Sequence, residues 1–242
     1  MLKKIKSVLM VMTVIFTTSI HAQTRNNQNL DTKQQAIIRI AGLTGKGDLS
    51  KLKDQLNAGL DAGLTINQIK EALMHVYAYA GFPRSLRGLQ TFITVLDERK
   101  AKGIEDVVGA EASPIPDDQS KYERGKAILE KLSGNKETGP KTGYAAFAPT
   151  IEVFLKEHLF ADIFERDVLT YQQRELVTIS VLSSIGGVEP MLGSHLNLSL
   201  NVGLTPSQLA EFVGVIKQAV GKKEAKVAQK VLDEVLSSKT EK

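Results

Sequence analysis

The sequence has 242 residues and contains no cysteine. This absence excludes a disulfide, a thiolate zinc site and a cysteine nucleophile. Tryptophan is also absent, and aromatic residues make up only 5% of the chain, which argues against a stacking platform for single-stranded nucleic acid. The rest of the composition, 42% hydrophobic and 24% charged, is that of a globular protein with one large domain or two small ones.

The formal net charge of +4 depends largely on the first six residues, which include three lysines. An apolar run over residues 8–16 follows, and the small residue Ala22 precedes Gln23. A basic start, a short apolar core and a small residue at the cleavage point predict a secretory signal peptide over residues 1–22. The apolar run is shorter than the roughly 20 residues that a membrane-spanning helix needs.

The chain that remains after this leader is nearly neutral. Three of the 31 Lys and Arg residues lie in the leader, so 28 remain beside 27 Asp and Glu residues, a net charge of +1. Neither a nucleic acid nor, after leader removal, a membrane is therefore expected as a partner. We expect a periplasmic or secreted protein that takes a small-molecule substrate.

Apolar residues recur at spacings of three and four through most of the chain, which predicts an all-α fold. Thr65, with Gln68 three residues later, forms a capping box at the start of a helix. Gly81 ends that helix, and Pro83 suits the first turn of the next one. Residues 103–119 hold two Pro, two Gly and five acidic residues, which is typical of a linker.

A shift of 140 residues aligns the two halves of the sequence without a gap. The identical pairs are Leu52/Leu192, Leu56/Leu196, Asn57/Asn197, Leu60/Leu200, Gly63/Gly203, Leu64/Leu204, Thr65/Thr205, Gln68/Gln208, Glu71/Glu211 and Gly81/Gly221. We interpret the chain as a duplicated helical unit. Its parts are then a signal peptide (1–22), a first repeat (23–102), a linker (103–119) and a second repeat (120–242).

Several segments carry a family resemblance. Residues 71–84 read EALMHVYAYAGFPR, residues 162–166 read DIFER, residues 174–179 read RELVTI, and residues 203–206 read GLTP. These segments, with His195, resemble the carboxymuconolactone decarboxylase family, relatives of the alkylhydroperoxidase-D proteins. The resemblance implies small helical units that assemble into rings of six. Three duplicated chains would build the equivalent ring, so we expect a homotrimer.

The resemblance points to Glu175 and His195 as catalytic residues. In the peroxidase branch of the family a Glu and a His assist two cysteines, which would fall here near Val188 and Met191. Neither position is a cysteine, so thiol-based peroxide reduction is excluded. A histidine oriented by a carboxylate suits general acid–base catalysis. The alternative is an ordinary carboxylate in the first turn of a helix and a partly exposed histidine.

Glu71, His75, Tyr79 and Arg84 are the candidate substrate-binding residues. His75 and Tyr79 are four residues apart and share one helix face, and a guanidinium at position 84 suits a substrate carboxylate. The alternatives are a buried structural histidine, a packing tyrosine and a solvated arginine. Because Glu71 has an identical counterpart in the second repeat, a role in helix pairing is as well supported as a role in catalysis.

The two repeats differ in which candidate residues they retain. The first repeat has Gln35 and Gln55 in place of the Glu175/His195 pair. The second repeat has Val215 and Ala219 in place of His75 and Tyr79. If the repeats pack about a pseudo-two-fold axis, the retained residues meet across one composite pocket.

The histidines show no metal-ligand spacing, and the sequence carries no phosphate loop, nucleophile elbow or nucleotide-binding motif. We therefore expect neither a metal nor a cofactor. The resemblance favours an exported, decarboxylase-like lyase that performs acid–base chemistry on a small carboxylate or lactone. The alternatives are a non-catalytic, ring-forming protein that binds a small ligand and a cysteine-less relative of the peroxidases.

The leader predicts where the mature protein begins. Protein recovered from the cell envelope should start at or near Gln23, because signal peptidase cleaves after a small residue such as Ala22. N-terminal sequencing checks this expectation. A full-length product confined to the cytosol would contradict the assignment of residues 1–22.

Overall fold

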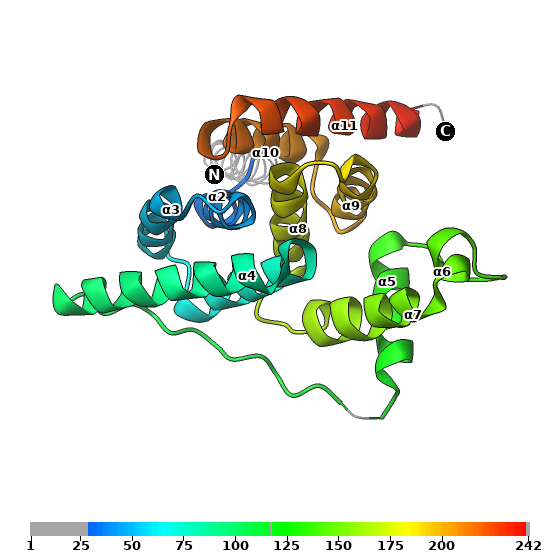
Figure 1. Ribbon diagram of the computed structural model, residues 1–242, viewed down its shortest axis with the longest axis horizontal. Coiled ribbons are helices and arrows are strands. Elements are labelled where there is room, and N and C mark those ends of the chain that lie inside the picture. The colour runs from blue at the N-terminus through cyan, green and yellow to red at the C-terminus, as the bar shows by residue number, and fades with distance from the viewer. Residues whose placement is uncertain (1–28, 117, 241–242) are drawn as a thin grey trace, which may run out of the picture.

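The computed structural model describes residues 29–116 and 118–240, so the predicted signal peptide lies outside the described residues. The described residues form helices and contain no strand, which confirms the all-α fold (Figure 1). Within the described part of the chain, no helix is long and apolar enough to cross a membrane.

The first repeat contains α2 (Thr32–Lys46), α3 (Leu49–Asp61) and α4 (Ile66–Ala101). The predicted capping box is present at the start of α4, where the Thr65 side chain accepts from the backbone N–H of Gln68 and the Gln68 side chain accepts in return. Gly81 has φ 76° and ψ 165°, which breaks α4 into two helical halves. This left-handed conformation favours glycine.

The second repeat contains α8 (Tyr171–Ile185), α9 (Glu189–Asn201), α10 (Pro206–Ala219) and α11 (Lys222–Thr240). The 140-residue shift places α2 on α8, α3 on α9 and the two halves of α4 on α10 and α11. Gly221 separates α10 from α11 where Gly81 breaks α4. The internal duplication is thus also visible in the order and length of the helices.

The second repeat, predicted to begin at residue 120, also holds four helices ahead of α8: α5 (Lys121–Ser133), α6 (Gly143–Phe147), α7 (Pro149–Phe154) and the π-helix η1 (Leu155–Phe164). These helices form a lobe beside the main bundle (Figure 1). The lobe has a small core of its own between α5 and η1, against which Tyr77 and Tyr79 of α4 pack. The sequence pattern predicts helix here, but it does not predict the π-helical hydrogen bonding.

The two repeats cross over in their packing. The central helices α2 and α8 pack against each other along much of their length. Helix α4 of the first repeat packs on α8 of the second, and α10 of the second repeat packs on α2 of the first. Equivalent helices of the two repeats thus make equivalent contacts with the opposite repeat, as a pseudo-two-fold arrangement requires. The two repeats share one continuous hydrophobic core.

Residues 103–116 pass beneath α4 as an extended segment (Figure 1). The carbonyl oxygens of Val107 and Val108 accept from the backbone N–H groups of Ile66 and Asn67, each at 2.9 Å. These bonds satisfy donors in the first turn of α4 that have no partner within the helix. The segment therefore holds the start of α4 as well as joining the repeats.

The packing of α5 against η1 can be tested at Gly125, because a Cβ there would overlap the backbone carbonyl oxygen of Lys156. Gly125→Ala should lower the free energy of unfolding by roughly 1–3 kcal/mol. Gly214→Ala in α10 is the matched control, because no heavy atom among the described residues lies within 4 Å of its added Cβ. In chemical denaturation, the free energy of unfolding of Gly214→Ala should equal that of the wild type or exceed it by up to about 1 kcal/mol. Equal stability of Gly125→Ala would contradict the close approach.

Candidate active site

A buried network of charges joins α4 to α8. Glu71 on α4 accepts from Arg174 Nη2 at 2.9 Å and from Arg166 Nε and Nη2 at 2.8 and 3.1 Å. Burial raises the pKa of Glu71, but the hydrogen bonds and charges of Arg166 and Arg174 outweigh it, so that the pKa is lowered. Glu71 is therefore an ionised partner of two arginines, buried at the contact between the repeats.

His75 lies next to this network, one turn further along α4, and is completely buried. Arg174 Nη1 lies 3.2 Å from Nδ1 of His75, and Nε2 lies 2.9 Å from Thr178 Oγ1. Because a guanidinium only donates, Nδ1 accepts, and the proton sits on Nε2 and is donated to Thr178. Burial, followed by the charge of Arg174, lowers the pKa of His75 well below its ordinary value. His75 is therefore a neutral, fully bonded side chain.

Glu175 and His195 contact each other, with Glu175 Oε2 2.9 Å from His195 Nδ1. Glu175 is completely buried on α8, whereas His195 on α9 keeps 12% of its side chain exposed. Glu175 Oε1 has no hydrogen-bond partner among the described residues. With Nδ1 donating to the carboxylate, Nε2 of His195 carries the lone pair and is a hydrogen-bond acceptor.

Tyr79 of the first repeat completes this arrangement. Its hydroxyl lies 3.5 Å from Nε2 of His195, and the two rings meet edge to face with centroids 5.5 Å apart. The Tyr79 ring also stacks on the ring of His75, with centroids 5.6 Å apart. Burial, followed by the negative charge of Glu175, raises the pKa of Tyr79 well above its ordinary value. The hydroxyl therefore remains a hydrogen-bond donor at neutral pH.

Residues from both repeats thus meet at one site, although Arg84 does not join it. The Arg84 side chain is exposed, and its guanidinium lies over Gly47 between α2 and α3, where a Cβ would overlap it. Its position gives no support to a substrate-binding role. Glu71 and His75 lie close to the site, but their polar atoms are already engaged with Arg166, Arg174 and Thr178.

The comparisons with known proteins fit this arrangement. Residues 15–92 and 149–234, together more than half of the chain, match the family described as "Carboxymuconolactone decarboxylase family". The chain belongs to the carboxymuconolactone decarboxylase family. Its two matched regions correspond to the two repeats. A protein of Methanocaldococcus jannaschii, named "Uncharacterized protein MJ1511", is 27% identical over 74 residues, which are 31% of this chain and 69% of that protein.

The sequence analysis did not predict that two arginines lie beside the candidate site of this decarboxylase family member. Arg166 and Arg174 both lie in the segments that carry the family resemblance, but neither was expected to take part in the site. The signal available was the presence of each arginine within such a segment, close to the predicted catalytic Glu175. Among the described residues, no group of three or more His, Asp or Glu side chains is placed to hold a metal ion.

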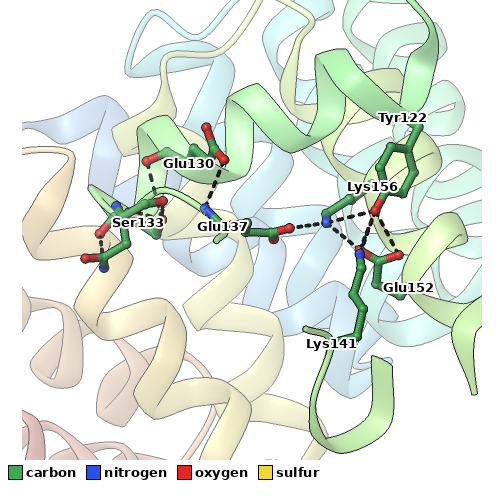
Figure 2. Close-up of polar contacts among 8 residues, drawn as sticks. Tyr122, Glu130, Ser133, Glu137, Lys141, Glu152 and Lys156 are labelled. Carbon is green, nitrogen blue, oxygen red and sulfur yellow. Dashed lines mark hydrogen bonds and ion pairs between the residues drawn. The ribbon is translucent and has the colours of Figure 1, made fainter. Parts of the chain in front are cut away.

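A second polar cluster, also missed from the sequence, lies in the lobe (Figure 2). Lys156, with only 1% of its side chain exposed, contacts Glu137 and Glu152, and Glu152 also contacts Lys141. Tyr122 donates to Glu152 at 2.9 Å. Burial raises the pKa of Glu152, but these three donors outweigh it and lower the pKa to about 2. The positive and negative charges of the cluster neutralise one another, and the ion pairs hold the loop after α5 against η1. In the sequence, the one sign of this cluster was the spacing of four residues between Glu152 and Lys156.

The neutral state of buried His75 predicts how stability depends on pH. The unfolded chain takes up a proton at this histidine below its ordinary pKa of about 6.5, whereas the folded chain resists it. The free energy of unfolding should therefore fall as the pH drops from 7.5 to 5.5, by at most about 1.4 kcal/mol per pH unit from this group.

His75→Gln should reduce this slope, because an amide accepts from Arg174 and donates to Thr178 without titrating. His158→Gln, the same substitution at a half-exposed histidine on η1 that contacts Asp162, leaves the buried His75 network intact and should retain the fall in stability at low pH that His75→Gln loses. Urea denaturation at several pH values measures both variants. An unchanged slope in His75→Gln would contradict a neutral His75.

Proposed function

We propose that this chain is a cofactor-independent enzyme that transfers a proton to or from carbon in a small carboxylate or lactone. The supporting observation is that three side chains contact one another in sequence. The buried carboxylate of Glu175 contacts the partly exposed imidazole of His195, which in turn contacts the protonated phenol of Tyr79. Imidazole is the side chain best suited to exchange protons near neutral pH, and a carboxylate partner fixes its orientation.

Each of the three residues has a distinct role in this proposal. Glu175 orients the imidazole through Nδ1, so that Nε2 of His195 faces the substrate beside the Tyr79 hydroxyl. Tyr79 donates a hydrogen bond to the substrate oxygen on which negative charge develops. Its raised pKa suits this role, because a phenol that stays protonated can donate throughout the neutral range.

Decarboxylation is the reaction that the family assignment favours. The bond between the carboxylate carbon and its neighbour breaks, CO2 leaves, and the electron pair moves onto a conjugated carbonyl oxygen as an enolate. Tyr79 stabilises that oxygen, and protonated His195 returns a proton to carbon. The overall reaction consumes one proton for each CO2 released.

Peroxide reduction by the dithiol route of the related peroxidases cannot operate here. The positions near which those cysteines are expected hold Val188, which is partly buried against the core, and Met191, which is half exposed one turn before His195. Thioether and isopropyl groups supply no thiolate nucleophile.

Export and assembly belong to the same proposal. The leader composition of residues 1–22 supports export. Phe82, Leu86 and Ile93 on the second half of α4 each expose more than half of their surface, which supports association between copies of the chain. A ring of six units, as the family resemblance implies, would make the assembly a homotrimer.

The enzyme proposal predicts turnover within a panel of γ-lactone carboxylates and β-keto acids, followed as CO2 release with proton uptake. His195→Gln, which cannot transfer a proton, should lower kcat by about 10²–10⁴-fold. Tyr79→Phe should lower it by about 10²-fold through loss of one donor. His158→Gln, at a histidine that lies outside the site, should keep the wild-type rate. No turnover in the panel, or equal turnover by His195→Gln, would contradict the proposal.

A further inference from the structure

A cavity of about 240 Å3 lies between α2, α3 and α10, on the other side of the pseudo-two-fold arrangement. Its polar lining residues are Arg39, Lys51, Asp54, Gln55 and Gln218. The 140-residue shift places Gln55 on His195 and Ala219, which also lines the cavity, on Tyr79. The cavity is therefore the counterpart of the Glu175–His195–Tyr79 site, built from α2 and α3 of the first repeat and α10 of the second.

Ala219 occupies the position that corresponds to Tyr79, so this cavity has no aromatic ring where the Tyr79 ring contacts His195 in the other site. That difference contributes to the space in the cavity. The carboxylate–imidazole pair of the other site has no equivalent here, because the counterparts of Glu175 and His195 are the amides of Gln35 and Gln55. The cavity is thus unsuited to proton transfer and open to a small ligand.

Two basic side chains replace apolar ones in this cavity. Arg39 and Lys51 stand where the second repeat has Ile179 and Met191. Arg39 Nη2 donates to Gln35 Oε1 at 3.2 Å, and Gln35 Nε2 in turn donates to Glu211 at 2.9 Å and to the Leu30 carbonyl at 3.2 Å. Gln35 therefore orients the guanidinium, as its counterpart Glu175 orients His195.

The charges of the lining determine which ligand fits. The guanidinium of Arg39 makes no ion pair with an acidic side chain among the described residues, and its fork geometry matches a carboxylate. Lys51 is already paired with Asp48 at 3.2 Å, so Arg39 is the basic side chain of the lining with which a single ligand carboxylate can pair. A cavity of this size is smaller than typical drug-sized pockets, which begin near 300 Å3.

We infer that this cavity is a binding site for a small organic monocarboxylate, separate from the Glu175–His195–Tyr79 site. The carboxylate pairs with Arg39, the amides of Gln55 and Gln218 supply further hydrogen bonds, and the carbon skeleton occupies the space beside Ala219. This inference does not depend on the proposed enzymatic activity, because binding at the cavity is measured without turnover.

The test uses benzoate as the probe and benzamide, which has nearly the same shape but no charge, as its control. Calorimetry on the wild-type protein should show benzoate binding that weakens with added salt, and benzamide binding at least about tenfold weaker, because a charged hydrogen bond contributes more than a neutral one. Equal binding of both compounds would overturn the inference.

Variants assign the binding to the cavity. Arg39→Gln should weaken benzoate binding at least about tenfold, and Ala219→Tyr should abolish it by filling the space. Circular dichroism and thermal unfolding establish that each variant is folded. Lys53→Gln, which removes one positive charge from α3 outside the cavity lining, is the matched control and should leave benzoate binding unchanged. Binding that is lost in Tyr79→Phe but kept in folded Arg39→Gln would assign benzoate to the other site and overturn the inference.

Discussion

The buried ion pair between Glu71 and Arg174 is the interaction on which the site depends. Removal of Glu71 would leave Arg174 as an uncompensated buried charge, a change that typically costs 3–5 kcal/mol. The pair fixes the first half of α4 against α8, and the same guanidinium holds His75 in one tautomer. His75 then supports the Tyr79 ring, whose hydroxyl faces His195 on α9. The electrostatics of a helix contact therefore set the geometry of the candidate active site.

The corresponding contact in the other half of the molecule is made differently. Glu211, the counterpart of Glu71, accepts from Gln35 and from the backbone N–H of Leu30. The counterpart of Arg174 is Gln34, whose side chain serves the capping box of α2 instead. A carboxylate is thus retained at both helix contacts while its donors differ, because a buried acceptor needs donors but not one particular residue type.

Sequence patterns were informative where the cause is local. The Thr65–Gln68 capping box and the break at Gly81 follow from backbone chemistry within a few residues. The duplication was readable because equivalent residues keep one spacing throughout. The burial of Arg174 and Lys156 was not predictable, because these residues are usually exposed and only tertiary packing brings carboxylates to them. The placement of Arg84 over Gly47 likewise depends on how α4 crosses the junction of α2 and α3.

The crossed packing also explains how the two sites were free to diverge. Each site takes one helix from one repeat and two from the other, so a single substitution changes only one of them. In a symmetric dimer of single repeats, every substitution would alter both sites together. Fusion removes that constraint: Tyr79 belongs to one site and Ala219 to its counterpart, while the helix contacts that hold the repeats together remain. One site can therefore keep an oriented imidazole while the other exchanges its acid–base residues for a guanidinium and amides, with no change in the fold.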